Sequence, residues 1–416
     1  MKRDIYECKK RLAKAISLVK ESTKISEQNK KIILDFIADC QIDGAGWGEP
    51  LSIPRVGTYA FTLRKIAEWL EKDFDRAEKG DIKRLLISIE AQNIKPHTKQ
   101  FFKVSIKKLY KWLNGGEDYP ELVRQIKTNL RKMEYPWDLL TEQDIIKMIE
   151  AEGNPRNRAL IMTLAESGCR VGELASLDIK DVIFDDLGIK ILVDGKTGQR
   201  PIRLLASAPY LAAWINVHPQ KNNPQSPLWI NIGHPNHGQA MKYEMISALL
   251  KRAANKAGIT KRVNPHSFRH ARATVLGMWM GQSQRCVYMG WVKNSRMSQI
   301  YDHLTGVDTE GSLLEMCGME TKTKKESLLK PKVCQICQEW NEVTALVCKK
   351  CAKPFEVKIA IDIDEKRVKD IKAVTDMITP EVLEGLVKKI IKSKFEELIK
   401  IHPNANAFLD SLAEKG

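Results

Sequence analysis

Apolar residues recur at helical spacing in three stretches of the first 131 residues, which predicts a small all-helical domain. The pair Gly115-Gly116 ends the third of these helices. The polar, basic segment that follows, to about Tyr135, is typical of a linker. The stripes contain Ile32, Ile33, Phe36 and Ile37; Ile66, Trp69 and Leu70; and Phe102, Val104, Ile106, Leu109, Tyr110 and Trp112.

The region from about residue 137 to residue 318 mixes helical and strand-like patterns. Thr141 and Asp144 have the spacing of a capping box, and Asn157–Ser167 predicts an apolar helix. Three β-branched runs follow, and the last two are joined by Asp-Gly-Lys-Thr-Gly at 194–198, which is typical of a hairpin turn. The pattern then returns to helices, so we expect a mostly helical domain with a small antiparallel sheet. The candidate strands are Val182–Phe184, Lys190–Val193 and Pro201–Leu204.

The last part of the chain begins with a Lys/Thr-rich segment over 319–333 that is typical of a linker. Closely paired cysteines follow, and in the tail Thr379 is placed to cap a helix whose first turn holds Pro380. We therefore expect a mainly α protein with a mixed, mostly helical central domain. Its expected parts are a helical domain over 1–131, a domain with the small sheet over 137–318, a cysteine module over 331–356 and a helical tail over 357–416.

The charge balance adds a polyanionic partner to this picture. The 416 residues carry a formal net charge of +16, and the isoelectric point is near 9.3. DNA, RNA and anionic membrane surfaces all fit such a balance, which many lysine-rich proteins also share. A hydrophobic content of 43% is enough for ordinary globular cores.

A membrane-spanning protein is not expected from this sequence. The first 22 residues are interrupted by Lys and Arg and contain no apolar core of a signal peptide. The most apolar stretches, such as Ala159–Ala165 and Val275–Gly281, are too short to cross a bilayer. We therefore expect a cytoplasmic protein.

Four of the nine cysteines form two close pairs, and the other five are scattered singly, as reduced thiols usually are. Cys334-x-x-Cys337 and Cys348-x-x-Cys351 are separated by ten residues. Four thiolates at this spacing satisfy a tetrahedral Zn²⁺ ion, so the sequence predicts a zinc ribbon with a closed, structural site. Redox-active or structural disulfide pairs are the alternative.

Several segments carry side chains suited to chemistry, although each alone has an ordinary structural explanation. Arg170, one turn before Glu173, is also typical of a surface ion pair. His266 and Arg269 share a helical face because they are three residues apart, which also fits a basic helix surface. Tyr301 by itself is typical of a half-buried core residue.

The order of these residues is more specific than any one of them. It is Arg170, Lys196 in the hairpin, His266-x-x-Arg269, Trp291 and Tyr301. This order resembles that of the tyrosine recombinases, the phage-type integrase family. The segment "ESGCRVGELASLDIKDV" is similar to the family's first box, and "NPHSFRHARAT…MGW…QIYDHL" is similar to its second. The likeness covers roughly residues 50–310, because "TYAFTLRKIAEWL" and "HTKQFFKVSIKKLYKWL" resemble the family's helical core-binding domain.

The resemblance implies a role for each site residue. Tyr301 would be the nucleophile that attacks a DNA phosphodiester and forms a covalent 3′-phosphotyrosine. Arg170 and Arg269 would hold the non-bridging oxygens and stabilise the charge of the transition state. Lys196 would protonate the 5′ leaving group, and His266 would orient the phosphate or assist proton movement.

Two positions depart from the pattern or have competitors. Trp291 lies where the family has His or Trp and offers only an indole N–H and packing. It precedes Tyr301 by ten residues, one more than the resemblance leads us to expect. Lys190 and Arg200 lie near Lys196, which we favour for its place in the Gly-Lys-Thr-Gly turn.

The resemblance implies a site-specific recombinase that cuts and rejoins double-stranded DNA at attachment sites, as a homotetramer on two duplexes. Since the phosphotyrosine conserves the energy of the broken bond, neither ATP nor a catalytic metal is expected. The zinc ribbon is not part of the family's core pattern and suggests an archaeal mobile-element integrase. The alternatives are a type IB topoisomerase-like enzyme that relaxes DNA and an inactive DNA-binding regulator with the same fold.

Overall fold

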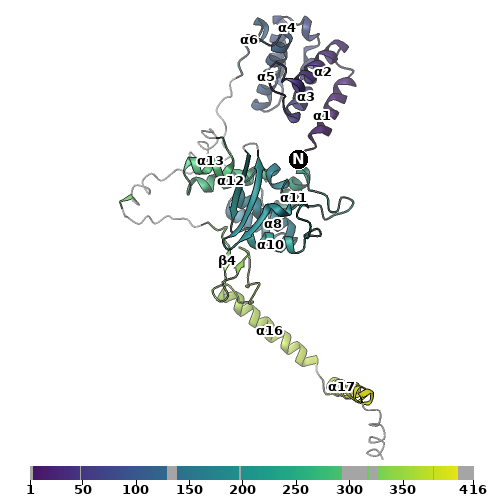
Figure 1. Ribbon diagram of the computed structural model, residues 1–416, viewed down its shortest axis with the longest axis vertical. Coiled ribbons are helices and arrows are strands. Elements are labelled where there is room, and N and C mark those ends of the chain that lie inside the picture. The colour runs from purple at the N-terminus through teal and green to yellow at the C-terminus, as the bar shows by residue number, and fades with distance from the viewer. Residues whose placement is uncertain are drawn as a thin grey trace, which may run out of the picture. The chain divides into compact units, whose positions relative to one another are not determined.

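The computed structural model describes residues 3–46, 48–128, 138–195, 198–292, 316–317, 327–377 and 379–401 (Figure 1). By contacts, the chain divides into two compact units, Met1–Lys330 and Pro331–Gly416. Among the described residues, no helix is both long and apolar enough to cross a membrane.

The N-terminal part of the first unit is an all-helical bundle, as the apolar stripes predict. Phe36 is fully buried at its centre, and its ring lies 5.7 Å from that of Tyr59 and 5.5 Å from that of Trp112, centroid to centroid. Burial of such side chains stabilises the bundle by roughly 1.5–3 kcal/mol each. Its helices are α1 (Cys8–Lys20), α2 (Glu27–Ile42), α3 (Ile53–Leu70), the 3₁₀ helix η1 (Phe74–Arg76), α4 (Lys79–Ala91), α5 (Pro96–Leu113) and α6 (Glu121–Arg124).

The segment predicted to be a linker after Gly116 is partly structured. The short helix α6 lies within it, and Val123 and Ile126 are buried in the bundle core. These two apolar side chains explain why the segment is structured although a linker was predicted, since the prediction rested on the polar and basic residues around them. Residues 129–137, where the rest of the linker is predicted, lie outside the described residues.

The second part of this unit packs helices against one face of a small antiparallel sheet. The capping box is confirmed: the Thr141 hydroxyl accepts from the Asp144 N–H at 3.2 Å, and the Asp144 carboxylate accepts from the Thr141 N–H at 2.9 Å. The predicted apolar helix forms α8, which ends at Gly168 with φ of 57°. The helices are α7 (Glu142–Glu150), α8 (Pro155–Ser167), α9 (Val171–Ala175), the 3₁₀ helix η2 (Ile179–Asp181), α10 (Ala208–Asn216), α11 (Tyr243–Lys256), α12 (Pro265–Gly277) and α13 (Gln282–Met289).

The sheet has the order β1-β2-β3 and contains all of the candidate strands. The register of the hairpin pairs Ile191 with Ile202 and Gly195 with Gly198. Inward-facing positions of β2 and β3 are apolar apart from Arg200, which is also buried. The strands are β1 (Val182–Asp185), β2 (Gly188–Gly195) and β3 (Gly198–Leu204).

The C-terminal unit contains the four paired cysteines and two long helices. A small hairpin of β4 (Lys332–Val333) and β5 (Trp340–Asn341) lies beside the cysteines, and the helices α16 (Val357–Met377) and α17 (Pro380–Ile401) follow. Thr379 caps α17, because its hydroxyl accepts from the Val382 N–H at 3.4 Å. In the part of the chain that is described, the architecture is therefore mainly helical with a small antiparallel sheet, as expected from the sequence.

A buried carboxylate joins the end of β3 to α8. The side chain of Glu166 accepts the backbone N–H groups of Leu205, Ala206 and Ser207 at 2.6, 3.0 and 2.7 Å. It also accepts the Ser207 hydroxyl at 2.6 Å. The turn that leads into α10 is therefore fixed to α8 by one side chain.

We predict that Glu166→Ala lowers the free energy of unfolding by about 3 kcal/mol or more, because it leaves several buried N–H groups without acceptors. Urea denaturation followed by circular dichroism measures this loss. Glu150→Ala, at an exposed position of α7, is the matched control and should change stability by less than about 0.5 kcal/mol. Equal stability of the two variants would contradict the assigned role of Glu166.

Candidate active site

The turn between α8 and α9 positions Arg170. Gly168 adopts a left-handed conformation there, and a Cβ atom on it would lie 2.9 Å from the side chain of Arg272. This close approach and the positive φ both favour glycine. The chain then enters α9 with Arg170 as its N-cap residue, so the guanidinium starts from a fixed backbone position.

The half-buried guanidinium of Arg170 is held by two acceptors. Its Nη1 donates to the Glu173 carboxylate at 2.9 Å, and its Nη2 donates to the Gly290 carbonyl at 3.0 Å. The contact between Arg170 and Glu173 is the one that their spacing suggested. The side chain keeps about a third of its surface exposed, so a ligand can reach it.

Arg269 comes from α12 and is almost entirely buried. Its Nη1 donates to the Gly168 carbonyl at 2.9 Å and its Nη2 to the Met289 carbonyl at 2.7 Å. Burial and the positive charge of Arg170 lower the pKa of Arg269 to about 10, which still leaves it charged at neutral pH. Its guanidinium carbon lies 5.7 Å from the centre of the Trp291 ring.

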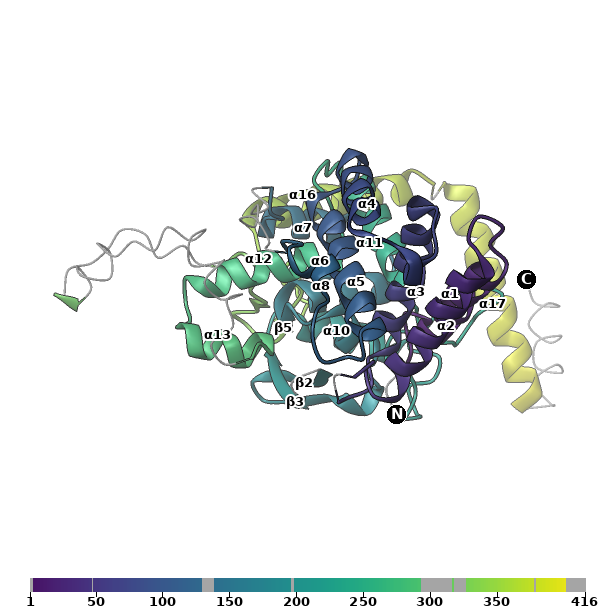
Figure 2. The same ribbon diagram turned by 90° about the horizontal axis from the view of Figure 1, so that it is seen from above.

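The C-terminal end of α13 accepts hydrogen bonds from several of these arginines. The consecutive carbonyls of Met289 and Gly290 accept from Arg269 and Arg170, and the Tyr288 carbonyl accepts from Arg200 Nε at 3.0 Å. A helix C-terminus carries partial negative charge, which suits cations. The helices α12 and α13 lie next to each other (Figures 1 and 2). Arg170, which precedes Gly290 by 120 residues in the sequence, contacts the same helix end from the turn before α9.

Trp291 follows this helix end and is 8% exposed. Its backbone N–H donates to the Cys286 carbonyl at 2.8 Å, which fixes the chain as it leaves α13. The indole ring packs in a small apolar cluster with Met289 and Leu276. Packing against Arg269 is therefore a role that the geometry supports for this side chain.

His266 is only partly covered on α12, one turn before Arg269. Partial burial and the positive charges of Arg269 and Arg170 lower the pKa of His266, so the neutral imidazole is favoured at neutral pH. A neutral imidazole accepts a proton or a hydrogen bond. The ring of His270 lies 6.2 Å away, and its pKa is also lowered, mainly by burial.

Lys196 and Tyr301 lie outside the described residues. The competitors of Lys196 are placed by the structure: Lys190 lies 3.3 Å from the Asp185 carboxylate, and Arg200 is buried against Glu173. The role of Lys196 stays a prediction, as does that of Tyr301.

Sequence reasoning named Arg200 only as a neighbour of Lys196 and missed its place in this cluster. Both of its terminal nitrogens donate to Glu173, at 3.2 and 2.8 Å. The available signal was its phase along the strand, because Arg200 shares the inward face of β3 with Ile202 and Leu204. A charged residue at an inward position needs a buried partner.

The described cluster can bind an anion. It contains the three guanidiniums of Arg170, Arg200 and Arg269 and the single carboxylate of Glu173, so positive charge remains in excess among these four side chains. A groove beside His266 and His270 adds Lys251 and other basic residues to the same region. Fork-shaped cations that are already oriented are suited to phosphate.

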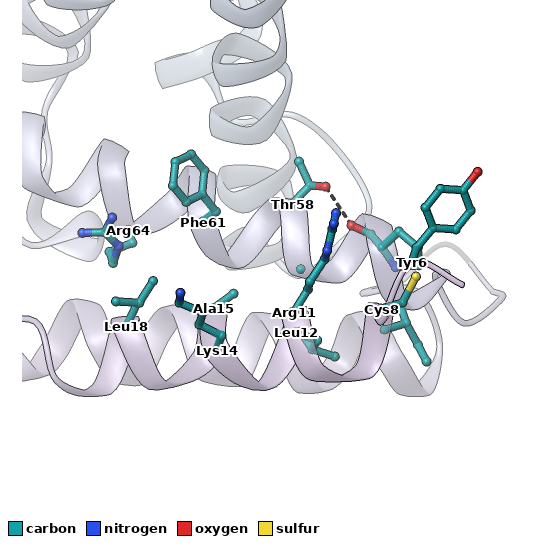
Figure 3. Close-up of a pocket in the computed structure, with 13 residues that line it drawn as sticks. Tyr6, Cys8, Arg11, Leu12, Lys14, Ala15, Leu18, Thr58, Phe61 and Arg64 are labelled. Carbon is teal, nitrogen blue, oxygen red and sulfur yellow. Dashed lines mark hydrogen bonds between the residues drawn. The ribbon is translucent and has the colours of Figure 1, made fainter. Parts of the chain in front are cut away.

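The structure also has an apolar cavity of about 670 Å³ between α1 and α3. Figure 3 shows its lining, with Leu18 and Lys14 on one helix and Phe61 on the other. None of the predicted catalytic residues that the structure describes lines this cavity. It is therefore separate from the arginine cluster.

The four cysteine Sγ atoms of the C-terminal unit lie within 4.8 Å of one another, and the Sγ–Sγ distances of Cys334–Cys351 and Cys337–Cys348 are 3.5 Å. Both cysteine pairs form the same turn. The Gln338 N–H donates to the Cys334 carbonyl, and the Ala352 N–H donates to the Cys348 carbonyl. Zinc–sulfur bonds of about 2.3 Å place tetrahedral ligands about 3.8 Å apart, so the cluster fits a zinc ion.

Several known proteins are similar to this chain in sequence. The model of the phage integrase family matches residues 139–306. A tyrosine recombinase of Synechococcus elongatus is 31% identical over 121 residues, which cover 29% of this chain and 38% of that protein. The tyrosine recombinase XerA of Saccharolobus solfataricus is 24% identical over 302 residues, which cover 69% of this chain and 94% of that protein.

A similar fold occurs in a crystal structure of the site-specific recombinase XerH bound to a palindromic difH substrate. The TM-score is 0.52 at 19% identity, and the match covers 76% of this chain and 97% of that one. The structural likeness therefore shows the fold. The chain spans less than two thirds of the length of the Synechococcus relative.

We predict that Gly290→Ala destabilises the protein more than backbone strain alone explains. Gly290 has φ of 61°, and a Cβ atom there would lie 2.5 Å from Arg200 Nη1. Left-handed strain costs about 1–2 kcal/mol, and the overlap with the guanidinium adds about 1 kcal/mol or more.

Gly258→Ala provides the control, since its φ is 68° and nothing lies within 4 Å of the added Cβ. The free energy of unfolding of both variants is measured by urea denaturation. Equal losses would show that Arg200 does not occupy the space beside Gly290.

Proposed function

We propose that this protein is a site-specific DNA recombinase. The premise is that residues 139–306 form a domain of the phage integrase family. The protein cuts and rejoins double-stranded DNA at attachment sites through a covalent 3′-phosphotyrosyl intermediate. The observation that carries this proposal is the convergence of Arg170 and Arg269 on adjacent carbonyls at the end of α13. The ordered motif from Arg170 to Tyr301 supports it.

In the proposed reaction, Tyr301 Oη attacks the scissile phosphorus while the bond to the 5′ oxygen breaks. Arg170 and Arg269 hold the non-bridging oxygens, whose negative charge increases in the transition state; each such donor contributes roughly 3–4 kcal/mol in comparable sites. Lys196 donates a proton to the departing 5′ oxygen. His266, neutral at pH 7, accepts a hydrogen bond or the tyrosine proton.

Trp291 supports this site by packing against Arg269. Attack of a 5′ hydroxyl on the phosphotyrosine reverses the chemistry and rejoins the strand, so no ATP and no catalytic metal take part. The helical region over 1–131 would close around DNA opposite the 137–318 domain. Exchange between two duplexes requires four active subunits, and a homotetramer is therefore the proposed assembly.

The C-terminal module at 331–356 is proposed to be a zinc ribbon, followed by the helical tail over 357–416. Cys334, Cys337, Cys348 and Cys351 would bind one structural Zn²⁺ and stabilise the fold of the module. The ribbon fits an integrase of an archaeal mobile element, acting in the cytoplasm on DNA. Lys349 and Lys353 would add basic charge near the ribbon.

The proposed chemistry predicts a denaturant-resistant protein–DNA adduct. The protein is incubated with a nicked duplex that carries its attachment site, and the product is separated under denaturing conditions. Tyr301→Phe should abolish the adduct, because it removes the nucleophilic oxygen. Tyr119→Phe, at a half-buried position of the helical bundle, should form it at the wild-type rate.

Failure of the wild-type protein to form an adduct, or an undiminished adduct with Tyr301→Phe, would refute the proposal. Exchange of strands between two duplexes separates a recombinase from a topoisomerase-like enzyme. DNA binding without an adduct would identify a regulator that keeps only the fold.

The zinc ribbon predicts one zinc ion per chain, measured by elemental analysis of the purified protein. Cys348→Ser should lose the metal and increase proteolysis of residues 331–356, since the fold of a small zinc module depends on its metal. Cys317→Ser, at an exposed cysteine outside the cluster, should retain one zinc ion. Full zinc content in Cys348→Ser would contradict the ligand assignment.

A further inference from the structure

Glu173 is the most enclosed charged side chain of the arginine cluster, at 3% exposed. One carboxylate oxygen accepts from Arg170 Nη1 at 2.9 Å and Arg200 Nη1 at 3.2 Å. The other accepts from the Arg170 backbone N–H at 3.0 Å and Arg200 Nη2 at 2.8 Å. The carboxylate therefore lies between the two guanidiniums.

The charge state of Glu173 depends on these partners. Burial raises the pKa of its carboxyl group, but the hydrogen bonds and positive charge of Arg200, with the contribution of Arg170, outweigh burial and hold the pKa below its usual value. Glu173 is therefore ionised at neutral pH. A buried carboxylate needs a compensating charge and well-placed hydrogen bonds.

Arg200 meets this requirement from the far side of the carboxylate. It is 9% exposed and donates through both terminal nitrogens to Glu173 and through Nε to the Tyr288 carbonyl at 3.0 Å. The absence of side chains at Gly195 and Gly290 leaves room for this pair, because a Cβ on Gly195 would overlap Glu173 and one on Gly290 would overlap Arg200. The pair is thus built into both the hairpin and the end of α13.

The pairing of Glu173 with Arg200 affects how much positive charge Arg170 presents to a phosphate. If Arg170 were the sole partner of Glu173, the carboxylate would neutralise its charge and draw its guanidinium into a bidentate pair. With Arg200 present, Glu173 is already neutralised, and Arg170 uses a single terminal nitrogen on it. Its second nitrogen is oriented by the Gly290 carbonyl instead.

We propose that Arg200 is a positioning residue: by neutralising and holding Glu173, it keeps Arg170 oriented and positively charged toward the scissile phosphate. This inference rests on the proposed function and adds a residue that acts through another rather than on the DNA. A lysine at this place would match the charge but not the fork that meets both carboxylate oxygens.

The test is a double-variant cycle of Arg200→Met and Glu173→Gln in the full-length protein. The single-turnover rate of adduct formation is measured at saturating protein on the nicked attachment-site duplex, together with DNA affinity and the melting temperature. Arg200→Met should slow adduct formation about 10- to 100-fold, as expected for a displaced catalytic group, with little change in DNA affinity.

Glu173→Gln removes the charge that Arg200 neutralises, so it should restore part of the rate. We expect Arg200→Met/Glu173→Gln to react roughly tenfold faster than Arg200→Met, within the coupling range of directly contacting residues. A residue that only stabilises the fold would not produce this recovery. Arg200→Gln, neutral but polar, replaces Arg200→Met in the same cycle if the latter is unfolded at the assay temperature.

Two results would overturn the inference: a wild-type rate in Arg200→Met, or a double variant no faster than Arg200→Met. Both presuppose that the wild-type protein forms the adduct. Absence of the adduct in the wild-type protein would instead refute the proposed function, so the two failures are distinguishable.

Discussion

A buried carboxylate between two guanidiniums is the interaction on which the candidate site depends. Glu173 is enclosed by α9 and the hairpin, and its negative charge is compensated by Arg170 and Arg200. Because breaking such a pair leaves an uncompensated buried charge, the helix, the hairpin and the end of α13 must keep their relative positions. The fold therefore holds its cations close together, against their mutual repulsion, through one anion and a set of backbone carbonyls.

Glycines make this arrangement possible at the points where chain segments approach most closely. Gly168 and Gly290 both end helices in the left-handed conformation, and each also leaves room for an arginine side chain. The helix end at Gly290 also orients two arginines, since the Gly290 carbonyl accepts a hydrogen bond from Arg170 and the Met289 carbonyl accepts one from Arg269. Gly290 thus determines both the backbone geometry of the helix end and the orientation of the arginine charges around it.

The cysteine module is organised by a different principle. Its four Sγ atoms lie together with little apolar core around them, whereas the described part of the first unit is held by buried aliphatic and aromatic side chains. For so small a unit, metal–thiolate bonds are an efficient source of stability. The proposed zinc ion would consequently act on the fold of the C-terminal unit, while the proposed phosphate chemistry would take place at the arginine cluster of the other unit.

The sequence by itself determined the helices, the strands and the hairpin, because apolar periodicity, capping boxes and Gly-containing turns are local signals: Thr141, Gly168 and the pair Gly195–Gly198 act as expected. It also indicated the cysteine cluster and the order of the site residues. Only the tertiary structure decided which side chains meet. Arg200 could be placed against Glu173, 27 residues away, only once the sheet was packed on α9, since no local pattern encodes a contact between distant segments. For the same reason, the burial of Val123 in α6 and of Ile126 after it could be recognised only in the packed bundle.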